Sequence, residues 1–489
     1  MSARISRVEA LHGAKWSAVE SFGGQALSFL VFLLLARLLS ARDFGVIAIA
    51  NIFVLVAQYL IFQGLGQAIL QFEDLDDLHL DTIFWINLVI GIALVLLTIA
   101  GAPLVESAVR TPGLGAILRG LSPVLLFAAL TDAPNNLLSR TMRFRTLAWR
   151  TIFSYSAGAV AAVVLACRGA GAWSLVAQQL VIWSANLVIL TASTPWRPRF
   201  RFCMGRARRL LGFGAHLLWS DLVGLVNRRS DQLFVGRFFG PLTGGLYSVG
   251  SRVAMLVSEV LIRSFGRVTV AALSRLQDAG ARFNTAVYEA AEMQGALILP
   301  VAVGLAIVAP DVVALFLGTK WAGAVPIMQA LLLACPFEAL STVHQSALVA
   351  RGRPHWCSII TTAHAVANVA LFAVAIRWGA RGIAVAFACR AGLLYFVELS
   401  LLRRVAGLSA KRFLKPLAAQ AAAALAMAGM ILLVREQFKN GTALALLAAS
   451  LVTGAATYIG LVALFNPRLV KLIKVARLPI LRSPHTVPQ

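Results

Sequence analysis

Apolar segments of about twenty residues recur along this chain from residue 16 almost to residue 465, and this recurrence limits what the chain can fold into. An α-helix needs about twenty apolar residues to cross the hydrocarbon core of a bilayer. Of the 489 residues, 59% are apolar and 13% are charged, whereas soluble domains are about 45–50% apolar and about 25% charged. The pattern therefore predicts an all-α polytopic membrane protein without a large soluble domain.

The apolar windows predict fourteen transmembrane helices. Their ranges are near 16–39, 44–70, 82–104, 116–138, 149–167, 171–192, 210–236, 241–262, 290–316, 323–349, 356–376, 380–402, 413–434 and 441–465. The N-terminal segment is too long for the apolar core of a cleavable signal peptide, and another span follows it at once.

The basic residues predict the orientation of the chain. With the N-terminus in the cytoplasm, 29 of the 44 Lys and Arg residues fall in cytoplasmic segments and 11 on the opposite side. This asymmetry is the positive-inside pattern, and it favours an even helix count with both termini cytoplasmic. It also explains the net charge of +24 without nucleic acid, because the cations lie in short loops rather than in one patch.

A repeat divides the chain into two equivalent halves. Residues 37–45 (RLLSARDFG) and 237–245 (RFFGPLTGG) each lie between two apolar helices, and the pairs 169–170 and 379–380 correspond later in each half. The offset grows from 200 to 210, so about ten extra residues are expected in the loop 263–290. Two halves of six helices each predict a two-fold axis along the membrane normal, an arrangement typical of transporters.

The predicted organisation consists of six parts. These are a cytoplasmic N-terminus (1–15), an N-terminal six-helix lobe (16–192), a basic cytoplasmic linker (193–209), a C-terminal six-helix lobe (210–402), an additional helix pair (413–465) and a cytoplasmic tail (466–489).

Charged residues inside the predicted spans indicate a polar cavity. A charge at the bilayer centre costs about 2.5–3.5 kcal/mol, and the helix 210–236 carries Asp221, Arg228, Arg229 and Asp231. Helical spacing places Asp221, Arg228 and Asp231 along one side. We therefore expect this side to face a wet lumen rather than lipid.

Arginine suits a pyrophosphate, while amides suit sugars. On this basis we predict a substrate site from three arginines of the second half and three amides of the first: Arg228, Arg229, Arg252, Asn51, Gln58 and Gln25. Four acidic residues are candidates for ion pairing or coupling: Asp231, Glu259, Glu20 and Asp221. Three arginines are candidates for a cytoplasmic entrance that attracts anionic headgroups: Arg140, Arg143 and Arg145.

Simpler roles for these residues stay open. Arg228 with Asp231, and Arg252 with Glu259, could be structural ion pairs. The arginines at 140–145 could be topology signals alone. We interpret His344 and His364 as satisfied histidines of the helix bundle rather than proton relays.

Four segments carry a resemblance to a known family: 36–50 (ARLLSARDFGVIAIA), 137–155 (LLSRTMRFRTLAWRTIFSY), 171–180 (GAWSLVAQQL) and 227–253 (NRRSDQLFVGRFFGPLTGGLYSVGSRV). With the repeat, they cover about residues 14–402. In these segments the chain resembles bacterial polysaccharide transporters, the oligosaccharide-lipid flippases of the multidrug/oligosaccharidyl-lipid/polysaccharide exporter superfamily.

The resemblance implies a flippase that moves undecaprenyl-pyrophosphate-linked oligosaccharide to the periplasmic leaflet of the bacterial inner membrane, for O-antigen, capsule or exopolysaccharide assembly. It implies membrane lipids as surroundings and leaves open the polysaccharide polymerase and the chain-length machinery as partners.

Three alternatives differ in cargo or class. A lipid II flippase of peptidoglycan synthesis differs only in cargo. A drug exporter is disfavoured because arginines would repel an organic cation. A membrane polymerase or ligase is disfavoured because the predicted periplasmic loops are short. We expect no enzyme activity, cofactor or metal, since the sequence has no GxxxxGK[ST] motif and its five cysteines are isolated.

The predicted topology can be tested with reporter fusions. Fusions after residue 110, in the loop at 320 and at 437 should report a periplasmic location, and fusions at 205 and 408 a cytoplasmic one, because of the distribution of Lys and Arg. A reversed signal at any of these five positions would contradict the fourteen-helix topology.

Overall fold

The fold is known from a computed structural model. It describes residues 13, 15–62, 66, 69, 76–276, 280–438 and 442–466, without the side chains of residues 206, 208–221, 263, 264, 267, 268, 271, 405 and 406. Within these ranges, twelve helical segments are long and apolar enough to cross a membrane. The predicted all-α polytopic fold is confirmed. The count of fourteen stays a prediction, because Leu222–Ile262 and Pro354–Arg404 each contain two of the predicted helices.

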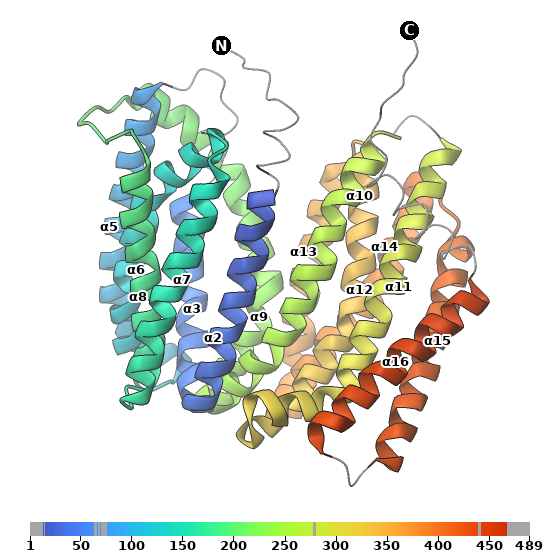
Figure 1. The fold of residues 1–489 in the computed structure, drawn as a ribbon. Coiled ribbons are helices and arrows are strands. Elements are labelled where there is room, and N and C mark those ends of the chain that lie inside the picture. Colours follow the sequence, from blue (N-terminus) through green and yellow to red (C-terminus); the bar gives the residue numbers. More distant parts are fainter. Residues whose placement is uncertain are drawn as a thin grey trace. The chain divides into compact units, whose positions relative to one another are not determined.

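The chain forms two compact units, which we describe separately. Unit 1 spans Met1–Ser248, and its helices lie side by side in Figure 1. They are the π-helical turn η1 (Val19–Gly23) and the α-helices α2 (Gly24–Leu38), α3 (Ala41–Phe62), α5 (Asp77–Val109), α6 (Leu114–Arg140), α7 (Phe144–Cys167), α8 (Ala172–Ser193) and most of α9 (Met204–Val257).

Unit 2 spans Val249–Gln489. After the end of α9 it contains η2 (Ser258–Arg263), α10 (Ser264–Ser274), α11 (Ala281–Val312), η3 (Val313–Leu317), η4 (Thr319–Ala324), α12 (Val325–Ala350), α13 (Pro354–Ala375), η5 (Ile376–Trp378), α14 (Gly379–Ala406), α15 (Ala410–Gln437) and α16 (Ala443–Phe465).

The range α9 contains the two separate helices that the sequence predicts at 210–236 and 241–262, with no loop between them. Its backbone is non-helical only at Gly240, which has φ 76° and is followed by Pro241. Glycine adopts this left-handed conformation without steric cost, so the break changes the direction of the chain without a loop. The extra residues of the second half also differ from expectation, because 264–274 form the helix α10 and not part of a loop.

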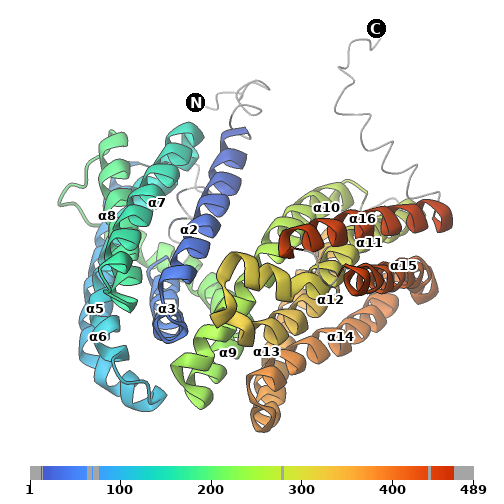
Figure 2. The ribbon, with the colours of Figure 1, turned by 60° about the horizontal axis from the view of Figure 1, so that its bottom comes forward.

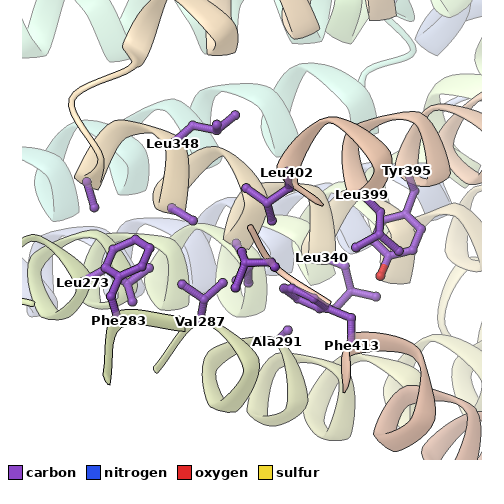
Figure 3. Close-up of a cluster of buried hydrophobic side chains, with 14 of the residues drawn as sticks. Leu273, Phe283, Val287, Ala291, Leu340, Leu348, Tyr395, Leu399, Leu402 and Phe413 are labelled. Carbon is purple, nitrogen blue, oxygen red and sulfur yellow. The ribbon is translucent and has the colours of Figure 1, made fainter. Parts of the chain in front are cut away.

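A shared apolar core joins α10, α11, α12, α14 and α15 of unit 2. Leu273, Phe283, Leu340, Leu402 and Phe413 are buried together in it, as Figure 3 shows. The close packing of these side chains contributes dispersion contacts between the helices.

The additional helix pair packs on α11 (Figure 2). Val308 of α11 lies in one apolar cluster with Met427 of α15 and Tyr458 of α16. An ion pair between Arg435 and Asp311 links α15 to α11 as well. The segment 413–465 is therefore an integral part of unit 2.

The two copies of the repeated motif contact each other through glycines. A Cβ atom on Gly45 would overlap the carbonyl oxygen of Pro241, and one on Gly245 would overlap that of Ala41. The same hypothetical atoms would lie 2.9 Å from the Gly245 nitrogen and 3.0 Å from the Gly45 nitrogen. These contacts are reciprocal at an offset of 200 residues, which is the signature of a two-fold contact.

Substitution of these glycines should destabilise the protein. We expect Gly45→Ala and Gly245→Ala each to lower the free energy of unfolding by about 1–3 kcal/mol or more, because rigid backbone lies where the methyl group must go. The measurement is the fraction of detergent-solubilised protein that stays monodisperse after heating. Gly429→Ala and Gly460→Ala are matched controls, since nothing lies within 4 Å of their added methyl groups. Equal melting of all four variants would contradict the close contact.

Candidate functional site

Helix α3 runs antiparallel to the first part of α9 in unit 1. A Cβ atom built on Gly236 of α9 would lie 2.6 Å from the Ile49 side chain of α3. Further along the same two helices, the Arg228 guanidinium donates a hydrogen bond of 3.3 Å to the Tyr59 hydroxyl. Gly45 and Tyr59 are fourteen residues apart on α3, so Arg228 lies about 20 Å along the axis from the glycine contact. This depth is well inside a span that crosses about 30 Å of hydrocarbon.

Arg228 and Asp231 lie in different surroundings, although they belong to one predicted stripe. Arg228 is exposed and folds back over Gly224, whereas Asp231 is 4% exposed and accepts a hydrogen bond of 2.9 Å from the Tyr247 hydroxyl. Tyr247 is fully buried beyond the Gly240 break. Asp231 therefore links the two parts of α9 inside unit 1, while Arg228 is presented outward.

The other predicted substrate-binding residues are partly buried. Arg229 donates to the Gln232 side chain at 3.3 Å. Gln25 lies on α2, Asn51 and Gln58 lie on α3, and Arg252 lies at the start of unit 2. Arg228, Asn51 and Gln58 thus share two neighbouring helices. Their common role with Arg252 stays a prediction.

The predicted coupling carboxylates differ in their partners. Glu20 lies in η1 and accepts a hydrogen bond of 2.9 Å from Arg150 of α7, which also donates to Asn135 of α6 at 2.7 Å. Arg150, near the start of the predicted helix 149–167, is therefore part of an interhelical link. Glu259 lies in η2. Both carboxylates lie in π-helical turns, which are frequent at functional sites. The Asp221 side chain lies outside the described residues.

The three entrance arginines lie at the turn between α6 and α7. Arg140 donates to the Ile69 carbonyl oxygen at 2.5 Å, which gives it a structural role. Arg143 is exposed, and the exposed Arg145 lies over the Trp16 ring at 5.7 Å from its centroid. Their role at a cytoplasmic entrance stays a prediction.

Two buried polar clusters were not singled out by the sequence analysis. In unit 1, Asp132 of α6 is 6% exposed and accepts hydrogen bonds of 2.9 Å from Asn87 of α5 and Asn136 of α6. An aspartate within an apolar window is the signal that could have drawn attention to it.

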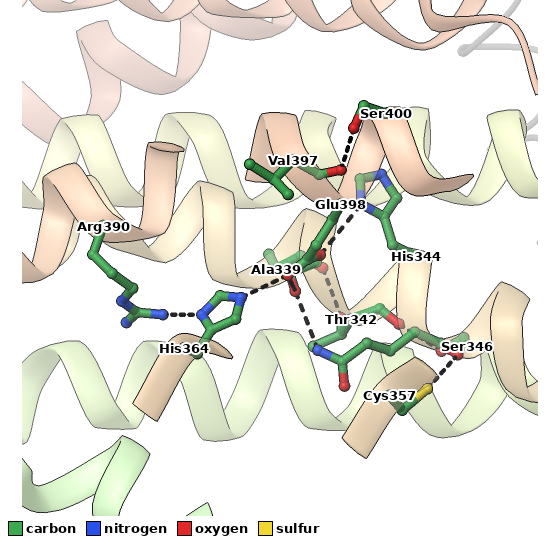
Figure 4. Close-up of polar contacts among 12 residues, drawn as sticks. Ala339, Thr342, His344, Ser346, Cys357, His364, Arg390, Val397, Glu398 and Ser400 are labelled. Atoms are coloured by element: carbon green, nitrogen blue, oxygen red, sulfur yellow. Dashed lines mark hydrogen bonds and ion pairs between the residues drawn. The ribbon is translucent and has the colours of Figure 1, made fainter. Parts of the chain in front are cut away.

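The second cluster lies in unit 2, and Figure 4 shows His344, His364, Arg390 and Glu398 of it. It joins α12, α13 and α14 through five side chains that are far apart in sequence: Glu338, His344, His364, Arg390 and Glu398. We call these five the charged cluster. His344 and His364 were named from the sequence only as satisfied histidines of the helix bundle, and Glu338, Arg390 and Glu398 were not named. Among the described residues, neither this cluster nor any other group of three or more His, Cys, Asp or Glu side chains could hold a metal ion.

The fold defines the class of protein. The chain is similar to the solved structure of the lipid II flippase MurJ in its inward closed conformation, with a TM-score of 0.74 and 18% identity over 93% of this chain and 99% of that chain. This similarity concerns the fold, and the twelve candidate spans among the described residues indicate a multi-pass membrane protein.

Sequence comparison gives the family. The model of the family described as "Polysaccharide biosynthesis protein" matches residues 34–326, which is more than half of the chain, so the chain belongs to this family.

The names of two relatives refer to polysaccharide biosynthesis. The chain is 29% identical to the succinoglycan biosynthesis transport protein ExoT of Rhizobium meliloti, over 65% of this chain and 64% of ExoT. It is 23% identical to the lipopolysaccharide biosynthesis protein WzxC of Escherichia coli, over 71% of each chain.

The link between Glu20 and Arg150 should be needed for folding. Their side chains are 24% and 16% exposed, so Arg150→Met leaves a carboxylate without its cation and should cost about 3–5 kcal/mol. The double variant Arg150→Met, Glu20→Gln should recover most of this loss in a thermal unfolding assay. If the double variant melts no higher than Arg150→Met, the pair is not the cause of the destabilisation.

Proposed function

We propose that this chain moves undecaprenyl-pyrophosphate-linked oligosaccharide from the cytoplasmic to the periplasmic leaflet of the bacterial inner membrane by alternating access. Both termini lie in the cytoplasm in this proposal. A polymerase and its chain-length machinery then consume the cargo.

Support for a polysaccharide cargo comes from sequence. The family description and the names of ExoT and WzxC refer to polysaccharides. The likeness to MurJ at 18% identity concerns the fold alone, so it gives no separate support to lipid II as the cargo. A lipid-linked oligosaccharide is the form in which such polymers can be passed through a membrane in units.

The observation that carries the proposal is the exposed Arg228 about 20 Å from the glycine contact. An arginine at this depth costs about 2.5–3.5 kcal/mol against lipid, and an aqueous path lowers this cost. The guanidinium then presents paired donors, which match a pyrophosphate. Tyr59, Asn51 and Gln58 on the neighbouring α3 supply hydroxyl and amide groups for sugars.

Removal of the arginines should stop transport without loss of the protein. In a strain whose polymer depends on this chain, Arg228→Gln, Arg229→Gln, Arg252→Gln should lower polymer at least about tenfold. Each lost charge-assisted hydrogen bond is worth about 1.5–3 kcal/mol, and about 1.4 kcal/mol is tenfold. Membrane abundance is measured in parallel.

A matched control removes three exposed arginines elsewhere: Arg168→Gln, Arg377→Gln, Arg381→Gln. Normal polymer from the first triple variant at equal abundance would refute the arginine site. The double variant Arg228→Ala, Asp231→Ala tests the structural alternative, because an ion pair that serves folding alone predicts restored transport when both members are removed.

A further inference from the structure

The charged cluster is a continuous chain of contacts inside unit 2. Glu338 forms an ion pair of 2.9 Å with Arg390, Arg390 contacts Nδ1 of His364, and Nε2 of His364 lies 2.6 Å from Oε1 of Glu398. Nδ1 of His344 lies 3.5 Å from Oε2 of the same carboxylate. Figure 4 shows His364 between Arg390 and Glu398, with His344 on the other side of Glu398.

The cluster is buried in apolar helices. Arg390 and His344 are each 1% exposed, Glu398 is 4% exposed and His364 is 5% exposed. The Glu338 side chain is 33% exposed. Charges in such surroundings are retained only when they are paired, and in membrane spans they mark functional sites.

The contacts of His364 fix its protonation state. An arginine has donors only, so Nδ1 of His364 must accept from Arg390. The proton of the ring then lies on Nε2 and is donated to Glu398. A second proton on His364 would point at the guanidinium, and both groups would be cationic. His364 is therefore neutral as long as Arg390 contacts it.

The remaining charges do not balance. With neutral histidines, Glu338 and Glu398 contribute two negative charges and Arg390 one positive charge, so the cluster has a net charge of −1. Ser341 donates to Oε1 of Glu398 at 2.9 Å. Apart from their 3.5 Å ion-pair contact with each other, Oε2 of Glu398 and the ring nitrogens of His344 have no hydrogen-bond partner in the described part of the chain. One cation is missing at this position, and His344 can become that cation by taking up one proton.

The described neighbours that pack on the His344 ring are aromatic. The ring stacks on Tyr395 with centroids 5.1 Å apart and an angle of 17°, and it meets Phe413 of α15 edge-on. The other titratable groups nearby are the Tyr395 hydroxyl on α14, the Cys357 thiol on α13, which contacts the Gln345 carbonyl, and Tyr288 on α11, which packs on Phe413. The basic residues Lys411, Arg412 and Lys415 of α15 are exposed.

We propose that His344 and Glu398 form a proton-binding site that couples transport to a proton gradient, an inference that rests on the proposed transport function. The proton comes from water and gives His344 two N–H groups, of which Nδ1–H donates to Oε2 of Glu398. The carboxylate, now paired with an imidazolium, holds His364 less strongly. His364 in turn holds Arg390 less strongly, so proton uptake changes the contacts between α12, α13 and α14.

Histidine NMR of the wild-type protein tests the site directly. The chain has seven histidines, and ¹⁵N shifts of labelled rings in liposomes report tautomer and charge. As the pH is lowered across the range in which the protein stays folded, the ring assigned by His344→Gln should change from neutral to doubly protonated. The ring of His364 should stay neutral with its proton on Nε2. A His344 ring that keeps one protonation state over this range would overturn the proposal.

Transport in liposomes tests the coupling. At zero membrane potential, one proton exchanged per cargo lets a pH difference of one unit support an about tenfold ratio of cargo between leaflets. We expect this response in the wild type and in His355→Gln, whose histidine is exposed. His344→Gln and Glu398→Gln should still equilibrate cargo but lose the response. Glu398→Gln serves as the second variant if His344→Gln does not fold.

The two proposals fail in different ways. Wild-type protein that equilibrates lipid-linked oligosaccharide without a response to the pH difference would overturn the coupling and keep the flippase. Wild-type protein that moves none of this cargo would overturn the flippase, and the NMR titration alone would then decide the proton site.

Discussion

The structure depends on the absence of water around its helices. An apolar medium offers no partner to a buried polar group, so each such group has to find one on another helix. Glu20 is linked through Arg150 to α7 and α6, Asp132 joins α5 to α6, and the charged cluster joins α12, α13 and α14. The same few polar residues that are costly to insert therefore specify which helices are neighbours.

Close backbone contact is the second way in which these helices associate. Lipid is as apolar as leucine, so small residues at crossings contribute by allowing backbones to approach. Gly45 and Gly245 do this at equivalent positions of the repeat. Each copy of the repeated motif places a glycine against the backbone of the other copy. A duplicated sequence can preserve such a self-complementary contact, because the same residue type is needed at both equivalent positions.

Much of the fold could be predicted from the sequence, because hydropathy reports directly on the span of a helix. The predicted helix at 116–138 is α6, Leu114–Arg140, and the one at 441–465 is α16, Ala443–Phe465. The break between the predicted helices 210–236 and 241–262 is also present, at Gly240 of α9. The helix α10 was missed because its eleven residues are too few to cross a membrane.

The candidate site was less predictable, for a physical reason. Periodicity identifies the side of a helix, but it cannot identify what that side meets. Arg228 and Asp231 share a side, yet one is exposed and the other is buried against Tyr247, which lies beyond the break. His344, His364 and Glu398 stand on three different helices, so no local pattern reveals that they meet.

A coupled transporter needs two ligands that bias one conformational change, and a ligand can shift that change only by its difference in affinity between the two states. Proton uptake at a buried cluster of net charge −1 can provide such a difference in affinity. The electrostatic energies of a neutral and a charged cluster differ most where the dielectric constant is low. The exposed Arg228 has the opposite property. It is already charged and accessible, so it suits a charged cargo that has to enter and leave. The two kinds of site therefore place different demands on the fold: the proton site requires burial, and the cargo site requires water.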